Sequence, residues 1–213
     1  MSTALLAVKA AVLTPRRRYL LRHTFSGASL TPSDQGPNLA VLSGAMTVSG
    51  GTLKNNGVAN SRAGVTLAAN VTLEAKFRFA STSASADQRV VLNVRSDLVA
   101  ASDNNLYNNL EVVASKTGAY IQLGSRAGGS LTDISTVGLA WSADTDYWMR
   151  VVASGSRIEV LTSTNGTAFT SRIVATSALY PTQTGIEARI QDSGSDGNGA
   201  NGATIDSVTV TTP

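Results

Sequence analysis

The sequence predicts a single all-β domain of the antiparallel sandwich class, and three observations support that prediction. Apolar and polar residues alternate with a period of two along many short segments, as in strands with one buried and one wet face. Turn signals built from Gly and Asn separate these segments at intervals of about 8 to 12 residues, a spacing typical of sandwiches and barrels. Only 15% of the 213 residues are charged, and small polar residues that disfavour long helices supply most of the predicted surface.

The clearest strand is predicted at residues 71–79, because every second residue there is apolar. Its inward-facing residues are Val71, Leu73, Ala75, Phe77 and Phe79. Shorter segments repeat the pattern at 90–94, 106–112, 158–160, 186–190 and 208–210. Asn165 and Gly166 suit the positive φ angles of a tight hairpin turn, so we expect residues 157–162 to pair with residues 169–174.

The basic residues concentrate at the N-terminus. Residues 1–22 hold five basic residues and no acid, a charge of +5, whereas the rest of the chain holds 12 basic and 14 acidic residues, a charge of −2. The apolar run from Ala4 to Leu13 is too short to span a bilayer, and its charges follow it, which disfavours a secretory signal. We therefore expect an extended attachment arm at residues 1–22 before a β-sandwich at 23–213. The predicted partner-binding residues of the arm are Leu5, Leu6, Val8, Val12, Leu13, Arg16, Arg17, Arg18 and Arg22.

A family resemblance emerges at residues 141–169. This stretch contains a turn, the strand sequence YWMRVV that begins at Tyr147, a short Gly turn, and the turn sequence STNGTAF that begins at Ser163. It resembles the central hairpin of concanavalin A-like (laminin G-like) jelly rolls, and Thr24 to Gly27 and Ala203 to Val210 look like their opening and closing strands. The resemblance covers about residues 20–213 and implies a jelly-roll sandwich, a fold that hosts many functions.

The segment PRRRYLLR, from Pro15 to Arg22, follows an apolar stretch and precedes the jelly roll. This arrangement resembles virion structural proteins of tailed bacteriophages. It implies a non-enzymatic capsid decoration or tail component, assembled in the host cytoplasm and bound to other virion proteins through residues 1–22. A particle component is expected to be a symmetric homo-oligomer. We expect no membrane partner, and no nucleic-acid partner either, because no basic sheet studded with aromatic residues follows the arm.

Polysaccharide-cleaving enzymes on this sandwich carry two or three carboxylates on one strand face, in a Glu-x-Asp-x-Glu type of motif. The acidic residues predicted on strands all lack an acid two positions away; they are Glu74, Glu111, Glu159 and Glu187. Asp144 and Asp146 have the right spacing but fall in a predicted turn. The single histidine, His23, and the absence of cysteine disfavour a catalytic triad and a zinc site. The sequence therefore predicts that the chain is not an enzyme, and a secreted polysaccharide-degrading enzyme is the weakest hypothesis.

The second functional hypothesis is a lectin-type module that binds cell-surface glycans. Trp148 and Arg150 share the strand face that the alternation turns outward, so they are the candidate glycan-binding residues, whereas Tyr147 is expected in the core. No cofactor is required by the pattern. The one candidate is calcium, because residues 192–201 form a loop rich in Gly and oxygen ligands, with a solvated loop as the alternative. The candidate calcium ligands are Asp192, Asp196, Asn198 and Asn201.

Overall fold

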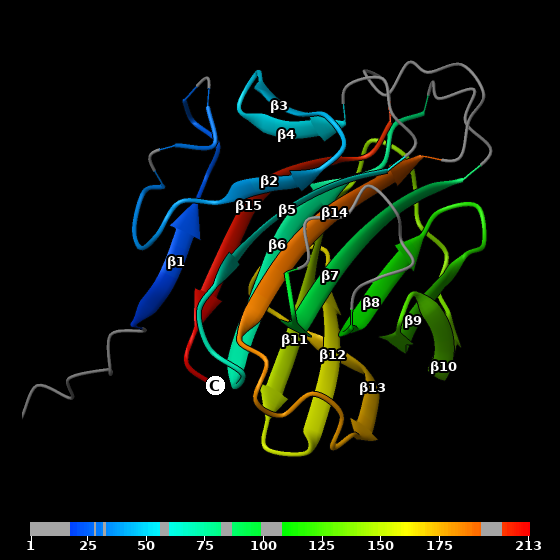
Figure 1. Ribbon diagram of the computed structural model, residues 1–213. Coiled ribbons are helices and arrows are strands. Elements are labelled where there is room, and N and C mark those ends of the chain that lie inside the picture. The colour runs from blue at the N-terminus through cyan, green and yellow to red at the C-terminus, as the bar shows by residue number, and fades with distance from the viewer. Residues whose placement is uncertain are drawn as a thin grey trace, which may run out of the picture.

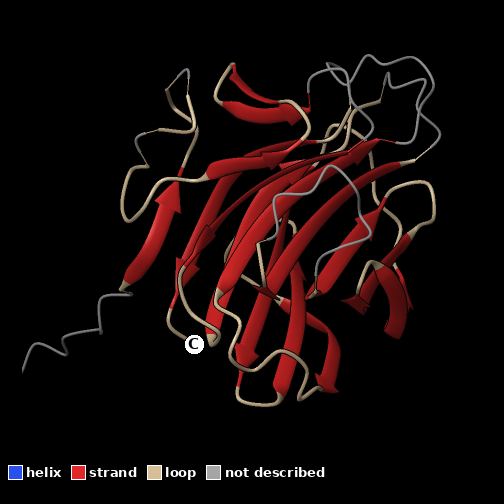
Figure 2. Cartoon of the chain, in the orientation of Figure 1, coloured by secondary structure: helices blue, strands red, loops and turns tan. Residues whose placement is uncertain are grey.

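The computed structural model describes residues 18–27, 29–31, 33–55, 60–81, 87–98, 108–192 and 202–213. Strands, turns and loops make up this part of the chain, as Figure 2 shows. Within these residues there is no helix long and apolar enough to cross a membrane.

Two antiparallel sheets contain all the described strands. Sheet A consists of β1 (Tyr19–His23), β3 (Met46–Ser49), β4 (Thr52–Asn55), β6 (Val71–Arg78), β11 (Asp146–Ser154), β12 (Arg157–Ser163), β13 (Thr170–Thr176) and β15 (Thr204–Thr211). Sheet B consists of β2 (Ala40–Ser43), β5 (Asn60–Thr66), β7 (Gln88–Ser96), β8 (Asn109–Ser115), β9 (Tyr120–Ala127), β10 (Ser130–Gly138) and β14 (Gly185–Asp192).

The strand order shows that the chain passes repeatedly from one sheet to the other. Sheet A runs β13-β12-β11-β6-β15-β4-β3, with β1 also pairing with β15, and sheet B runs β10-β9-β8-β7-β14-β5-β2. The sheets stack face to face, and β13 and β10, the end strands of the two sheets, lie on the same side of the molecule (Figure 1). These crossovers between antiparallel sheets make the sandwich a jelly roll.

The core lies between the sheets and follows the predicted alternation. The inward residues of β6 are fully buried, while Thr72, Glu74 and Lys76 between them are partly exposed, so the prediction for residues 71–79 is confirmed. The predicted hairpin is confirmed as well, because β12 and β13 pair antiparallel. At its turn, Gly166 has a φ of +73°.

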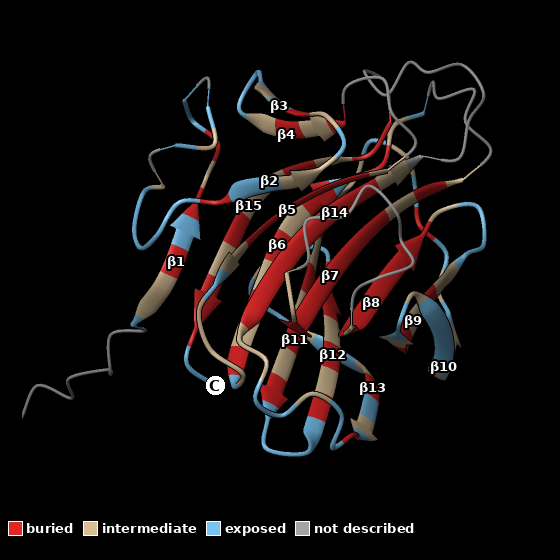
Figure 3. Cartoon of the chain, viewed as in Figure 1, coloured by how far each residue is buried: buried red, intermediate tan, exposed pale blue. Residues whose placement is uncertain are grey.

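The middle strands of sheet B differ from the expectation of one wet face. Every residue of β8, and every residue of β7 except Arg89, is buried, so both faces of these strands are covered (Figure 3). The outward positions carry polar and charged side chains, which are described below. The period-two pattern identified the inward residues correctly, but it gave no indication that the opposite face is also removed from water.

The N-terminal strand β1 begins at Tyr19 and pairs antiparallel with β15. Leu21 is fully buried in the core, and His23 stacks on Phe25 with ring centroids 4.3 Å apart. The boundary predicted between arm and sandwich, at residue 22, therefore falls inside a strand, and residues 19–22 belong to sheet A. Arg18 and Arg22 are exposed. The other predicted arm residues, from Leu5 to Arg17, lie outside the described residues.

Candidate functional site

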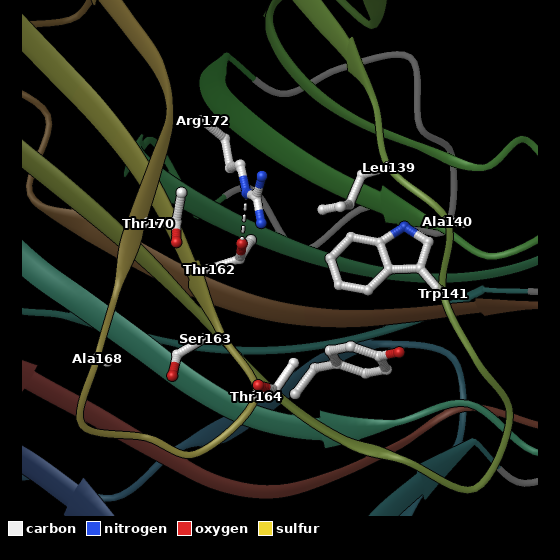
Figure 4. A pocket seen from close by; sticks show the side chains of 10 residues that line it. Leu139, Ala140, Trp141, Thr162, Ser163, Thr164, Ala168, Thr170 and Arg172 are labelled. Carbon is white, nitrogen blue, oxygen red and sulfur yellow. Dashed lines mark hydrogen bonds between the residues drawn. The ribbon is translucent and has the colours of Figure 1, made fainter.

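A pocket of about 240 Å³ opens between the sheets where β10 and β13 approach each other (Figure 4). We call it the edge pocket. Its lining comes from the loop after β10, the start of β11, the end of β12, the β12–β13 turn and β13. The lining residues are Leu139, Ala140, Trp141, Tyr147, Thr162, Ser163, Thr164, Ala168, Thr170 and Arg172.

Trp141 and Tyr147 form the aromatic wall of the edge pocket. Their rings meet edge to face, with centroids 5.0 Å apart and an interplanar angle of 86°. The indole N–H of Trp141 donates to the backbone oxygen of Tyr120 at 3.1 Å, and the hydroxyl of Tyr147 accepts from the backbone N–H of Ser142 at 2.9 Å. The two residues are 7% and 9% exposed. Because packing and hydrogen bonds hold both polar ends, the wall is rigid and presents an apolar edge to the pocket.

The opposite wall is polar because the row of inward residues on β12 ends in a threonine. Ile158 and Val160 point into the core, and Thr162 follows them on the same face. Thr170 pairs directly with Thr162 across the hairpin, so its side chain lies on the same side of sheet A. The hydroxyls of Thr162 and Thr170 therefore lie at the boundary between the core and the edge pocket.

Arg172 reaches this wall because β13 contains a bulge. Val160 pairs with Ile173 and Leu161 pairs with Ser171, which leaves Arg172 as the extra residue without a partner in the ladder. A bulge turns a side chain away from the direction that strict alternation would give it. Arg172 Nε donates to Thr162 Oγ1 at 2.8 Å, and the guanidinium is directed into the edge pocket, toward the side of Leu139 and Trp141 (Figure 4).

The predicted glycan-binding pair, Trp148 and Arg150, lies on the outer face of sheet A, as the alternation indicated. Arg150 donates to Glu74 at 2.8 Å from Nε, and its guanidinium carbon lies 3.6 Å from the ring centroid of Phe169. Both the charge and the flat face of this arginine are thus engaged within the protein.

Trp148 is also covered by its own neighbours. Lys76 Nζ lies 5.5 Å from the centre of the indole, and the backbone of Gly166 packs so closely that a Cβ atom there would be 2.8 Å from Trp148 Cε2. Glycine therefore fits this position for two reasons: it adopts the positive φ without strain, and it has no side chain to clash with the indole ring. The role of Trp148 and Arg150 in glycan binding stays a prediction, and sugar contact there would compete with these contacts.

A buried ionic cluster occupies the outward face of sheet B. Glu187 on β14 accepts hydrogen bonds from Arg62 at 3.3 Å and from Asn93 at 3.2 Å, and it also accepts one from Ser96. Glu111 on β8 pairs with Arg126 at 2.6 Å. Arg189 Nη2 lies 3.7 Å from the same carboxylate of Glu111.

The register explains how the two glutamates come onto one face. Glu111 pairs with Asn93, and Asn93 pairs with Glu187, so one strand separates the two acids. A search for acids two positions apart within a strand could not find this pair, because it depends on the pairing of three strands. Glu111 is 1% exposed and Glu187 is 0% exposed, and arginines neutralise both within the cluster. The arrangement is that of a structural ionic network in which each buried charge has a partner.

The predicted calcium ligands lie almost wholly outside the described residues. Asp192 ends β14 without a described side chain, and Asp196, Asn198 and Asn201 are not described. In the part of the chain that the structure describes, no group of three or more His, Asp or Glu side chains is arranged to hold a metal ion.

Comparisons by sequence find no relative. No protein-family model matches the chain, and no curated protein matches it. The fold, in contrast, is shared with many solved structures.

One similar structure is the metal-free exoplasmic/lumenal domain of VIP36, with a TM-score of 0.66, 13% identity, and coverage of 92% of this chain and 93% of that one. A second is the carbohydrate-binding module CBM66 from Bacillus subtilis, with a TM-score of 0.56, 12% identity, and coverage of 72% and 91%. A third is a structure from work on endo-acting O-glycanases of prominent human gut microbiota members, with a TM-score of 0.61, 12% identity, and coverage of 92% and 100%.

These identities, 12% to 13%, establish likeness of fold alone. The matches cover most of each chain. The predicted fold class is therefore confirmed, and the chain is an antiparallel jelly-roll sandwich of the concanavalin A-like kind found in lectin-like and carbohydrate-binding domains.

Proposed function

We propose that this protein is a non-enzymatic carbohydrate-binding module that takes one sugar ring into the edge pocket. The observation that carries the proposal is the composition of that pocket, with Trp141 and Tyr147 on one side and hydroxyls and a guanidinium on the other. A pyranose has an apolar C–H face and a rim of hydroxyls, so it needs an aromatic surface and convergent hydrogen-bonding groups in one small cavity.

The size of the edge pocket supports a single ring as its occupant. Its volume of about 240 Å³ lies below the range of roughly 300–1,000 Å³ that encloses drug-sized ligands. A longer oligosaccharide would therefore place one residue in the pocket and extend along the surface outside it.

The fold likeness supports binding of carbohydrate in general. CBM66 is a carbohydrate-binding module, and VIP36 has a Ca²⁺/Man-bound form with the same fold as this chain. A glycanase-related structure shares the fold too. However, the lining of the edge pocket contains no Asp or Glu that could act as acid, base or nucleophile, which favours binding over cleavage at this site.

A glycan array tests the proposal, with the wild-type chain compared with Ala168→Phe. Ala168 is exposed and lines the edge pocket, so a phenyl group there fills the pocket without entering the core. Ala178→Phe is the matched control, because Ala178 is exposed and does not line the pocket. We expect binding by the wild type and by Ala178→Phe, and loss of it in Ala168→Phe. Absence of binding to any glycan, or equal binding by all three proteins, would refute the proposal.

We also propose, from the sequence pattern alone, that residues 1–22 attach the chain to other proteins of a bacteriophage virion as a homo-oligomeric decoration or tail component. Its support is the PRRRYLLR segment and the charge of +5 on these residues. Deletion of residues 1–17 leaves β1 in place and should abolish incorporation into particles while the sandwich stays folded. Normal incorporation of the truncated chain would count against attachment through this segment.

Calcium binding by Asp192, Asp196, Asn198 and Asn201 is a further proposal, supported by the oxygen-rich loop sequence and by the Ca²⁺-bound forms of VIP36. Calorimetry with added Ca²⁺ tests it. Heat of binding that is lost in Asp196→Asn would support the calcium site. Absence of heat in the wild type would refute calcium binding.

A further inference from the structure

We propose that the edge pocket selects a sugar that carries a carboxylate, and that the terminal nitrogens of Arg172 bind this group. The inference rests on the proposed carbohydrate-binding function and names the chemical class of its ligand. A carboxylate on a pyranose ring occurs in hexuronic acids and in sialic acids, and the experiment below separates these two sources.

The hydrogen bonding of Arg172 leaves the end of its side chain available. Nε donates to Thr162 Oγ1, and this bond holds the side chain along the polar wall. Neither terminal nitrogen makes a hydrogen bond with any described residue. The two terminal nitrogens of a guanidinium form a planar fork that matches the two oxygens of a carboxylate.

Arg172 lacks the acidic partner that most arginines of the described sandwich have. Most of them form an ion pair with Asp or Glu; these are Arg62, Arg78, Arg89, Arg126, Arg150, Arg157 and Arg189. Arg95 has no acid but donates to the backbone oxygens of Ala69 and Ser177. Arg22 on β1 has no acid either, but it is exposed to solvent and lies over the ring of Tyr19. Arg172 is partly buried, and no Asp or Glu of the described chain lies within 4.0 Å of it. A partly buried cation without a counter-charge is costly, and an anionic ligand would supply that charge.

No Asp or Glu lines the edge pocket, so the lining contains no negative charge that would repel an acidic ligand. Arg172 is the one charged residue among the lining residues, and the others are apolar or carry hydroxyls. Thr162 accepts from Arg172, so its own hydroxyl proton remains to be donated, and the side-chain hydroxyl of Thr170 makes no hydrogen bond with a described residue. The hydroxyls next to Arg172 can therefore bind the ring oxygens beside the carboxylate, while Trp141 contacts the C–H face.

The bulge on β13 explains why Arg172 lies on the same side of sheet A as Thr162 and Trp141. Without the extra residue, strict alternation would turn the position next to Ile173 away from the core side. The bulge instead brings a cation onto the side of the sheet where Thr162 and Trp141 lie. Bulges at sheet edges commonly re-aim a side chain at a functional site, and β13 is the end strand of sheet A.

Titration calorimetry of the full chain with monosaccharide glycosides tests the inference. The ligands are methyl glucuronide, methyl galacturonide and the methyl glycoside of sialic acid, each compared with an uncharged partner: methyl glucoside, methyl galactoside and the sialic acid methyl ester. We expect at least one acidic glycoside to bind about tenfold more tightly than its neutral partner, as a charge-assisted hydrogen bond predicts. Preference for a uronide or for the sialoside identifies the source of the carboxylate.

The variants assign that preference to one residue. Arg172→Gln should bring the acidic and neutral ligands to equal affinity. Arg157→Gln, at the start of β12 and outside the pocket lining, should keep the wild-type ratio. Equal binding of acidic and neutral sugars by the wild type, or an unchanged ratio in a folded Arg172→Gln, would overturn the carboxylate preference and leave carbohydrate binding in place. Failure of every sugar to bind the wild type would overturn the proposed function and this inference with it.

Discussion

Two tryptophan–arginine pairs lie on different sides of sheet A, and they differ in what the arginine contacts. On the outer face, Arg150 beside Trp148 is bound to Glu74 and packs on Phe169. At the edge pocket, Arg172 faces the side of Trp141, and its side chain has one hydrogen-bond partner among the described residues, the hydroxyl of Thr162. The first pair is visible in the sequence as two residues close together on one strand. In the second pair, Trp141 comes from the loop between β10 and β11 and Arg172 from β13.

The comparison shows that an aromatic residue and a cation on one strand are a weak indication of a binding site. Cross-strand neighbours of opposite charge are common on the wet face of a sheet, and they occupy such residues. A cation that a bulge turns toward the core side meets apolar and hydroxyl groups instead. Availability for a ligand therefore depends on the neighbouring strands and not on the residue types alone.

The largest expected difference between the pairs is in stability. Trp141 contacts Phe77, Phe79 and Tyr147, so Trp141→Ala should lower the free energy of unfolding by about 3–5 kcal/mol. Trp148→Ala should cost about 1 kcal/mol, because Trp148 packs on the outer face only. Urea unfolding followed by circular dichroism measures both, and an equal loss in the two variants would contradict the assignment of Trp141 to the core.

Substitutions of Arg150 and Arg172 should also change the free energy of unfolding by different amounts, with a smaller difference than for the two tryptophans. Arg150→Gln removes a guanidinium that binds Glu74, so we expect the free energy of unfolding to fall by about 1–2 kcal/mol. Arg172→Gln removes no ion pair and should change it by about 0.5 kcal/mol or less. Glu74→Gln combined with Arg150→Gln provides the control, because the two changes should not add if the residues interact. A larger loss for Arg172→Gln would mean that this residue is structural.

The sequence predicted the fold well because the relevant signal is local. Period-two alternation placed Val71 to Phe79 in the core, and Asn165 with Gly166 placed the β12–β13 turn. It also placed Tyr147 in the core, where the residue is buried. These features depend on residues that are close together in the chain.

The site itself could not be predicted because it depends on register. Arg172 is one of many charged residues in the sequence, and only the pairing of β12 with β13 shows that it is the extra residue of a bulge. The same holds for Glu111 and Glu187, which share a face through Asn93 on the strand between them. One local signal was present in the sequence: Thr162 is a polar residue at the end of the inward row of Ile158 and Val160.

A further small effect is expected in the acid sensitivity of the ion-paired outer face. The hydrogen bond from Lys76 is the largest cause that lowers the pKa of Asp146, and the bond from Arg78 adds to it against the opposing effect of burial. Because the folded-state pKa lies below the unfolded value of about 3.9, the stabilisation is complete above that pH and is lost as the pH falls through the lowered pKa. Asp146→Asn should therefore cost about 0.5–1 kcal/mol near pH 6, as a surface pair does, and almost nothing near pH 2.

Thermal unfolding of the wild type and of Asp146→Asn between pH 2 and pH 7 measures this difference. A constant difference between the wild type and Asp146→Asn across the pH range would show that the carboxylate charge is not its cause.

The central claim, that a sugar binds at the edge pocket and not on the outer face of sheet A, can be tested directly by NMR. The chain has two tryptophans, so its two indole N–H signals report separately on the edge pocket and on the outer face, and a Trp148→Phe variant assigns them. The indole N–H of Trp141 is bonded to Tyr120 beside the pocket, so its signal should shift during titration with the tightest-binding acidic glycoside. The account predicts a shift of the Trp141 signal and none of the Trp148 signal; a shift of the Trp148 signal alone would contradict it.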